Sequence, residues 1–331
     1  GDHRDLHLSI RRQRQMCIRD SSGYSSDSFS NDGISFLQGK HQVAQKFIIM
    51  MLPFFSVKST SFRLKSLNFS LDFPSVGVTH FFLMMASLAE GQSVITNAAR
   101  EPEVIALAKM LNKMGAKIKG HGSNIITIDG VESLNGSRLC IPPDRIEAGT
   151  FAIAVSATGG NISLNGMNPE ELLLLSSLLE QSGTKITSSQ SSMEIKKDNK
   201  VINSLDISTA PYPGFPTDLQ AQFMALMALG SGISIIKENI FENRFMHVQE
   251  LARFGANIKL KGDTAIVKGV KKFNSAPVMA TDLRASASLI IAALSAKGKS
   301  TIRRIYHLDR GFDKIENKLR SCGAKIQRKR D

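Results

Sequence analysis

The tripeptide Thr-Asp-Leu occurs at 217–219 and again at 281–283, where a carboxyl group could take part in chemistry. Each copy precedes a stretch rich in Ala, Leu and Met that is typical of a helix. A carboxylate held at a helix start can serve as a general base. The structural alternative is capping, in which the Thr is the N-cap and the Asp lies in the first turn. Gln220 would then complete a capping box.

Capping is the first expectation for either Asp, and the loop before the first copy shifts the balance toward chemistry. It reads APYPGFPT at 210–217 and contains three prolines. Because proline fixes the backbone φ angle, we expect a stiff loop that holds Asp218 in place. A fixed carboxylate at this point is suited to act as a general base.

Three arginines occur in similar short strings: Arg244 in ENRF, Arg284 in DLRA and Arg310 in LDRG. Each is expected near a unit start or a turn, where helix N-termini also attract anions. Guanidinium groups bind carboxylates and phosphates through paired hydrogen bonds. The pattern predicts an anionic substrate, and the alternative for each arginine is a surface ion pair of little energetic value.

Several other kinds of site are excluded. The string GKST at 298–301 resembles the end of a P-loop, but position 293 is Ala where the motif needs Gly, and the string leads from a helix into a strand. The three cysteines are far apart, and the seven histidines lack metal-ligand spacing. We therefore expect neither a zinc site nor a redox site.

The elements that position these residues belong to an internal repeat. Four segments end in nearly the same phrase, with glycines 68, 72 and 68 residues apart and a Leu four residues before each. Each phrase predicts a helix that ends at a glycine, followed by a strand that begins near an Ile. The period favours packed α/β subdomains over a solenoid. The phrases are Gly115–Ile118, Gly183–Ile186, Gly255–Ile258 and Gly323–Ile326.

The composition is that of a globular protein of 331 residues, for which two domains are the expectation. Three cysteines exclude a disulfide scaffold and favour the cytoplasm. The longest apolar run, 47–55, is too short to span a bilayer. The net charge of +13 suits anionic substrates, whereas the absence of Trp gives nucleic-acid binding little support. Residues 1–62 do not fit the repeat, and we interpret them as an atypical segment, either disordered or artefactual.

With these residues assembled, the chain resembles the UDP-N-acetylglucosamine 1-carboxyvinyltransferase family, the enolpyruvyl transferases of peptidoglycan synthesis. The resemblance covers about residues 63–331. It implies an inside-out α/β barrel fold, with two domains of three α/β subdomains each and the helices packed inside. The matching strings are PSVGVT (74–79), NAAREPEV (97–104), PDRIEAGTF (143–151), FPTDLQAQF (215–223), FENRFMHV (241–248), ATDLRASASL (280–289) and LDRGF (308–312).

The resemblance implies six units, and this chain shows four of them. Residues 63–142 correspond to the last subdomain of a truncated N-terminal domain, and residues 143–331 to a complete C-terminal domain of three subdomains. The catalytic cysteine of the family and its Lys-Asn pair have no counterpart here. Because a cleft enzyme needs both walls, we expect this chain to be inactive by itself.

The implied reaction transfers the enolpyruvyl group of phosphoenolpyruvate to the 3-hydroxyl of UDP-N-acetylglucosamine with release of phosphate, the first committed step of peptidoglycan synthesis. Asp218 is the implied base, Asp282 assists proton transfer at the reacting carbons, and Arg310 binds phosphoenolpyruvate. The further residues implied in substrate binding are Ser75, Val76 and Gly77 around the uridine nucleotide, together with Ile240, Arg244 and Arg284. The resemblance implies neither a metal nor an organic cofactor.

Two other interpretations stay open. The chain could belong to the sister enzymes that make 5-enolpyruvylshikimate 3-phosphate, which share the fold and the donor phosphoenolpyruvate. It could also be a non-catalytic scaffold or binding remnant that has kept only the fold. The strings FENRFMHV and NAAREPEV favour the UDP-sugar enzymes. The expected partners are therefore UDP-N-acetylglucosamine and phosphoenolpyruvate, with neither nucleic acid nor membrane, and the oligomeric state is left open.

Overall fold

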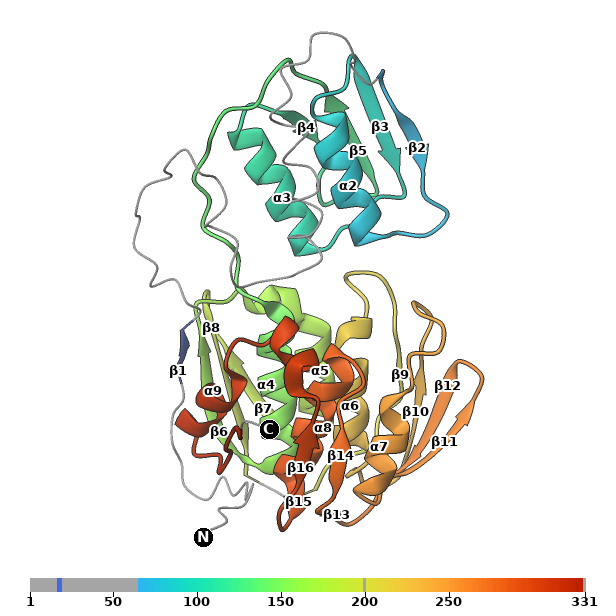
Figure 1. Cartoon of the computed structure of the whole chain (residues 1–331), viewed down its shortest axis with the longest axis vertical. Coiled ribbons are helices and arrows are strands. Elements are labelled where there is room, and N and C mark those ends of the chain that lie inside the picture. The colour runs from blue at the N-terminus through green and yellow to red at the C-terminus, as the bar shows by residue number, and fades with distance from the viewer. Residues whose placement is uncertain (1–16, 20–64, 199–200, 330–331) are drawn as a thin grey trace. The chain divides into compact units, whose positions relative to one another are not determined.

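The structure is a computed structural model that describes residues 17–19, 65–198 and 201–329. These residues divide into two compact units. One contains residues 65–142 together with Pro211–Pro213, and the other contains residues 17–19 and the rest of the described chain from Pro143 onward. Figure 1 labels the helices and strands of both units. The assignment of these units to two domains of the family stays a prediction.

The unit that precedes Pro143 is a four-stranded sheet with two helices on one face (Figure 1). The strand order is β2-β3-β5-β4, in which only the β2–β3 pair is parallel. Ile95 and Ile126 of the sheet pack with Leu83 and Leu111 of the helices in one apolar core. The elements are β2 (Asn68–Ser70), α2 (Val76–Ala86), β3 (Gln92–Thr96), α3 (Pro102–Lys113), β4 (Lys117–Lys119) and β5 (Ile125–Asp129).

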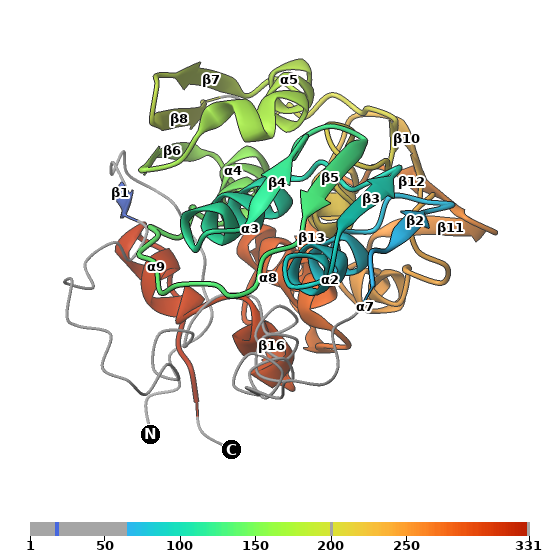
Figure 2. The ribbon, with the colours of Figure 1, turned by 90° about the horizontal axis from the view of Figure 1, so that it is seen from above.

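The other unit begins with a sheet of the same kind, ordered β1-β6-β8-β7, in which only β1 and β6 are parallel. Its helix α5 lies beside β7 (Figure 2). Most of residues 1–62 lie outside the described residues, but three of them form β1. The elements are β1 (Cys17–Arg19), α4 (Arg145–Thr158), β6 (Gly160–Asn165), η2 (Pro169–Leu172), α5 (Leu173–Gln181), β7 (Lys185–Ser188) and β8 (Ser192–Lys197).

The rest of this unit adds a third four-stranded sheet and two short parallel pairs. The sheet is ordered β9-β10-β12-β11 with only β9 and β10 parallel, and the pairs are β13–β15 and β14–β16. The elements are β9 (Ile207–Ser208), η3 (Thr217–Leu219), α6 (Gln220–Met227), β10 (Ile233–Lys237), α7 (His247–Arg253), β11 (Asn257–Lys261), β12 (Thr264–Lys268), β13 (Phe273–Asn274), β14 (Pro277–Met279), α8 (Leu283–Ser295), β15 (Ala296–Lys297), β16 (Thr301–Arg303), η4 (Ile305–Arg310) and α9 (Ile315–Ser321).

Three helices of this unit are buried almost all round. Every residue of α6 is buried, as are residues 145–156 of α4 and 284–294 of α8. Helices with no polar stripe belong in a core, and these three contact one another. The mixed α/β arrangement with helices inside agrees with the expected fold. Closure into a barrel and a total of six units stay predictions.

The predicted glycine stops are confirmed at all four positions. Each glycine has a φ angle between 93° and 105°, a backbone conformation that favours glycine. The residue that follows each glycine donates its N–H to the carbonyl of the Leu that lies four positions before the glycine. This is the bonding pattern of a Schellman motif. The four leucines are buried: Leu111, Leu179, Leu251 and Leu319.

The strand predicted after the fourth glycine is not found. Residues 324–329 form no strand, whereas β4, β7 and β11 follow the first three glycines. Those three strands each pair with an antiparallel neighbour. The short sheets of the last repeat contain parallel pairs only, so the described residues offer no such neighbour near Ile326.

Candidate active site

The structure brings three predicted site residues together around one carboxyl group. Arg244 Nη2 donates to Asp218 Oδ1 at 2.7 Å, and Arg284 Nη2 donates to Asp218 Oδ2 at 2.5 Å. The side chain of Arg284 is 8% exposed and that of Asp218 is 34% exposed. Each oxygen of the Asp218 carboxylate therefore accepts a hydrogen bond from one guanidinium group, while part of the side chain remains exposed to solvent.

Different elements supply the three residues. Asp218 lies in η3, directly after the Pro-rich loop, and Arg284 is the second residue of the buried helix α8. Arg244 lies in the segment between β10 and α7, where its guanidinium carbon is 4.8 Å from the centre of the Phe241 ring. The aromatic face adds a cation–π contact to the ion pair.

The capping interpretation is wrong for the first Thr-Asp-Leu. Pro216 is the N-cap of η3 and makes no side-chain capping bond, and α6 begins without one as well. Thr217 Oγ1 instead donates to Glu238 Oε2 at 2.9 Å and accepts from Arg244 Nη1 at 2.6 Å. The N–H of Gln220 donates to the backbone carbonyl of Thr217 and not to its hydroxyl, so the two residues form no capping box.

Capping is confirmed for the second copy, although by the Asp and not by Thr281. Asp282 is the N-cap of α8, and its Oδ1 accepts from the N–H of Arg284 at 2.8 Å and of Ala285 at 2.9 Å. Its Oδ2 accepts a longer hydrogen bond of 3.4 Å from Thr281 Oγ1. Asp282 thus uses one oxygen for structure and keeps the other largely uncommitted.

Arg310 lies next to this helix start. It is exposed at the end of η4, which contacts α8. A Cβ atom added to Gly311 would stand 2.7 Å from Cδ2 of Leu283, so the chain approaches α8 closely there. Gly311 therefore lies against Leu283, the residue between Asp282 and Arg284, and Arg310 directly precedes it without joining the Asp218 ion-pair cluster.

The electrostatics of Asp218 follow from its surroundings. Burial alone raises the pKa of its carboxyl group, but the charges and hydrogen bonds of Arg284 and Arg244 outweigh burial and hold the pKa well below its usual range. While both guanidinium groups are engaged, Asp218 is ionised and a weak base.

His247 belongs to this neighbourhood and was missed by sequence reasoning. It is 2% exposed at the start of α7, and its Nε2 has no hydrogen-bond partner among the described residues. Burial, the largest cause, lowers its pKa to about 4; Asp282 opposes this shift and Arg244 adds to it. The only available signal was its place three residues after Arg244 in FENRFMHV.

Ser75, Val76 and Gly77 form the start of α2 in the other unit. Ser75 is the N-cap, and its side chain accepts from the N–H of Val78 at 3.4 Å. Gly77 is exposed, and a Cβ atom added there would meet nothing within 4 Å. Packing therefore does not require a glycine at this position, and the helix start is accessible from outside.

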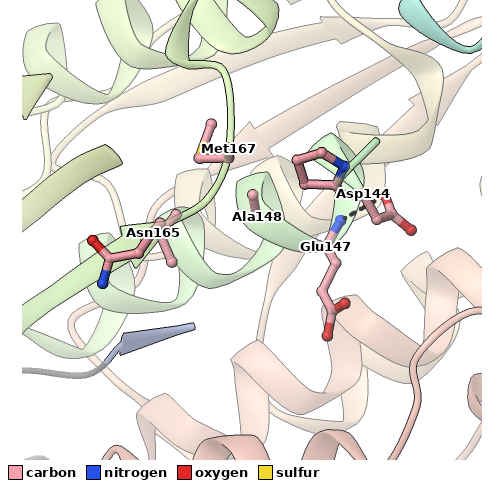
Figure 3. Close-up of a pocket in the computed structure, with 7 residues that line it drawn as sticks. Asp144, Glu147, Ala148, Asn165 and Met167 are labelled. Atoms are coloured by element: carbon pink, nitrogen blue, oxygen red, sulfur yellow. Dashed lines mark hydrogen bonds between the residues drawn. The ribbon is translucent and has the colours of Figure 1, made fainter. Parts of the chain in front are cut away.

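A pocket lies at the start of α4 (Figure 3). There Asp144 caps the helix by accepting from the N–H of Ile146 and Glu147, and Glu147 Oε1 accepts from Lys318 Nζ at 2.5 Å. None of the predicted site residues lines it, and we assign it no role. The lining residues are Pro143, Asp144, Glu147, Ala148, Leu164, Asn165 and Met167.

Two kinds of feature are absent from residues 17–19, 65–198 and 201–329. No group of three or more His, Cys, Asp or Glu residues there could hold a metal ion. Within the same ranges, no helix combines the length and apolar character needed to cross a membrane.

The chain is similar in sequence to UDP-N-acetylglucosamine 1-carboxyvinyltransferases. UDP-N-acetylglucosamine 1-carboxyvinyltransferase 1 of Mesorhizobium japonicum is 58% identical over 254 residues, which are 77% of this chain and 59% of the relative. The UDP-N-acetylglucosamine 1-carboxyvinyltransferase of Bartonella henselae is 55% identical over 267 residues, 80% of this chain and 62% of the relative. This chain is their homologue, and it spans about three fifths of their length.

Solved structures agree on the fold. The enolpyruvyl transferase NikO from Streptomyces tendae matches with a TM-score of 0.72 and 22% identity over 85% of this chain and 71% of that one. EPSP synthase from Acinetobacter baumannii matches with a TM-score of 0.59 and 20% identity over 78% and 63% of the two chains. The sequence pattern of the family EPSP synthase (3-phosphoshikimate 1-carboxyvinyltransferase) matches residues 50–319. The chain therefore belongs to the EPSP synthase family of enolpyruvyl transferases.

Proposed function

We propose that this protein serves the transfer of the enolpyruvyl group from phosphoenolpyruvate to the 3-hydroxyl of UDP-N-acetylglucosamine, in peptidoglycan synthesis. The observation that carries the proposal is the Arg244–Asp218–Arg284 cluster. It occurs in a chain that is 58% identical to the UDP-N-acetylglucosamine 1-carboxyvinyltransferase 1 of Mesorhizobium japonicum. Two guanidinium groups and an ionised carboxyl group suit an anionic donor and a hydroxyl acceptor.

In this reaction the sugar hydroxyl adds to C2 of phosphoenolpyruvate while C3 gains a proton. The resulting intermediate then loses phosphate and a proton from C3. Asp218 takes the hydroxyl proton in the first step. When the carboxylate or phosphate of the donor engages Arg244 and Arg284, Asp218 loses part of its ion pairing. Its pKa then rises toward the usual range and it becomes a stronger base.

Asp282 and Arg310 take the remaining roles near α8. Oδ1 of Asp282 is committed to capping, so Oδ2 is the oxygen that exchanges protons with C3. Arg310 is exposed beside this helix start and provides a further positive charge for the donor. Because burial keeps the imidazole of His247 neutral, His247 adds no further positive charge near Arg244.

The start of α2 receives the nucleotide part of UDP-N-acetylglucosamine in this proposal. Backbone N–H groups at a helix start attract phosphate, and Gly77 lets a ligand approach the backbone because no Cβ occupies that space. Ile240 contributes an apolar contact with the nucleotide or the sugar.

Phosphate release from phosphoenolpyruvate by the purified chain tests the proposal. Release that requires both substrates and is lost in Asp218→Asn supports the reaction and contradicts the expectation that the chain is inactive by itself. If there is no release, calorimetry with phosphoenolpyruvate decides. Saturable binding that is lost in Arg284→Gln supports the site, whereas absence of both release and binding overturns the proposal and favours a non-catalytic scaffold.

A second candidate is transfer to shikimate 3-phosphate. The family description favours it, as does the shared fold with EPSP synthase. This chain is 55–58% identical to enzymes that are named for UDP-N-acetylglucosamine, so we rank transfer to shikimate 3-phosphate second. Phosphate release with shikimate 3-phosphate but not with UDP-N-acetylglucosamine would reverse this order.

A further inference from the structure

Glu238 is a buried acidic residue beside the cluster that the proposed reaction does not use. It is 4% exposed and directly follows β10, while Thr209 directly follows β9. Because these strands are parallel and Lys237 pairs with Ser208, Glu238 and Thr209 lie side by side at the carboxyl ends of the two strands. Thr209 Oγ1 donates to Glu238 Oε1 at 2.8 Å.

The same oxygen holds the turn that follows. Glu238 Oε1 accepts from the N–H of Ile240 at 2.9 Å and from the N–H of Phe241 at 3.2 Å. Ile240 is the residue assigned to nucleotide or sugar contact, and the ring of Phe241 lies against Arg244. One oxygen of Glu238 thus fixes the segment that carries both side chains.

The other oxygen begins a chain of hydrogen bonds to the site. Glu238 Oε2 accepts from Thr217 Oγ1 at 2.9 Å, and Thr217 Oγ1 accepts from Arg244 Nη1 at 2.6 Å. A guanidinium group can only donate, so the hydroxyl must accept from it and has its own hydrogen free for Glu238. The second terminal nitrogen of Arg244 then reaches Asp218.

We propose that Glu238 is a positioning residue, which acts through the hydroxyl of Thr217 to orient the guanidinium group of Arg244 toward Asp218 and toward the anionic group of the donor. A carboxyl group that accepts four hydrogen bonds in the interior is a fixed reference point. The orientation toward Asp218 follows from the contacts alone. The orientation toward a donor rests on the proposed function.

The structural alternative is that Glu238 only holds the turn at Ile240 and Phe241. Glu238→Gln separates the two roles. An amide nitrogen facing the backbone N–H groups of the turn would place donor against donor, so the Gln must keep its oxygen there and present its NH₂ group to Thr217. Thr217 then receives donors from both sides, and its own hydrogen loses its acceptor. The turn is kept while the link to Arg244 is disturbed.

A pair of variants at Thr217 provides the matched comparison. Thr217→Val keeps the shape and removes the hydroxyl, and Thr217→Ser keeps the hydroxyl. The first measurement is the ¹³C titration of the Asp218 carboxyl group in the full chain, assigned with Asp218→Asn. We expect the midpoint to move upward in Thr217→Val and Glu238→Gln, because Arg244 is no longer held against Asp218. Thr217→Ser should titrate like the wild type.

The second measurement is the affinity for phosphoenolpyruvate by calorimetry. A hydrogen bond to a charged group is worth enough to change affinity about tenfold or more. We expect such a loss in Thr217→Val and Glu238→Gln, and restoration to within about twofold in Thr217→Ser. A residue that only held the turn would not give this pattern.

Thr184→Val is the control for the general effect of losing a buried hydroxyl. Thr184 is 3% exposed, and its hydroxyl donates to Ser156 Oγ at 2.9 Å. This variant should lower the melting temperature without moving the Asp218 titration. If the titration in Thr217→Val and Glu238→Gln matches the wild type, the positioning role is wrong. If it shifts as expected but the wild type does not bind phosphoenolpyruvate, the positioning role stands and the proposed function fails.

Discussion

The guanidinium group of Arg284 donates to the carboxyl group of Asp218 at 2.5 Å across 66 positions of the chain. Arg284 stands at the start of one buried helix, α8, and Asp218 directly before another, α6. Because α6 and α8 pack against each other, their starting turns bring the two charges together. The packing of the core therefore sets the geometry of the candidate active site.

Removal of the charge on Asp218 should destabilise the fold. Asp218→Asn leaves Arg284, which is 8% exposed, without an anionic partner, and Arg244 loses its ion pair as well. We expect a loss of about 1–2 kcal/mol in the free energy of unfolding, reduced because Asp218 is partly solvated. Urea denaturation measures it. Asp263→Asn is the control, because its 3.7 Å pair with Lys237 is exposed on both sides and should cost less than about 0.5 kcal/mol. Equal losses in both variants would contradict the burial argument.

Asp282 has a structural role and a proposed chemical role that two variants can separate. Asn caps a helix about as well as Asp, so Asp282→Asn should change the unfolding free energy by less than about 0.5 kcal/mol, while Asp282→Ala should lose about 1 kcal/mol. If Oδ2 exchanges protons with substrate, phosphate release should fall about a hundredfold or more in both variants. Wild-type release by Asp282→Asn would leave only the capping role.

His247 should make stability depend on pH below neutrality. Its pKa is about 4 in the folded protein, below the ordinary value of 6.5, so the unfolded chain takes up the proton first as the pH falls. Stability is therefore lost between about pH 6.5 and pH 4, by up to about 3 kcal/mol from this one group. Urea denaturation of wild type and His247→Gln should show their difference in stability shrinking over this range. A difference that is constant with pH would rule out a buried neutral histidine.

Two glycine substitutions should act in opposite directions. Gly255 has a φ angle of 93°, and a Cβ would meet only Asn274 Nδ2 at an ordinary 3.5 Å. Gly255→Ala should therefore cost about 1–2 kcal/mol through the backbone alone. Gly77→Ala lies inside α2 with free space around it and should be neutral or stabilising by up to about 1 kcal/mol. Thermal melts of both variants test this.

The Gly77 variant also tests the nucleotide site. If the nucleotide approaches the backbone at this helix start, Gly77→Ala should weaken binding of UDP-N-acetylglucosamine although the protein is no less stable. Unchanged affinity, measured by calorimetry against the wild type, would place the nucleotide elsewhere.

Sequence reasoning succeeded where the signal is local. The four glycine stops depend on a Leu and a Gly four positions apart, and all four form the same hydrogen bonds. Capping at the second Thr-Asp-Leu also depends only on neighbouring amides, although Thr281 was the predicted N-cap and Asp282 is the observed one. The prediction that the Pro-rich loop holds Asp218 as a general base used the same kind of information and stays a prediction.

It failed where a tertiary partner competes with a local one. Thr217 has the sequence of an N-cap but bonds to Glu238, 21 positions away, and to Arg244, 27 positions away. The segment near Ile326 resembles the three earlier strands in sequence, but it has no antiparallel neighbour among the described residues and forms no strand. His247 loses its hydration through the packing of its surroundings, which residue spacing does not reveal.

The burial of α4, α6 and α8 has a consequence for hydrogen exchange. Amides in helices shielded on every side open only when much of the unit unfolds, so these three helices should hold their protons longest. Asp218 and Arg284 lie at the ends of α6 and α8, where slow-exchanging helix meets exposed loop. The loops beyond them should exchange their amide protons faster than the helices whose starts hold these two charges.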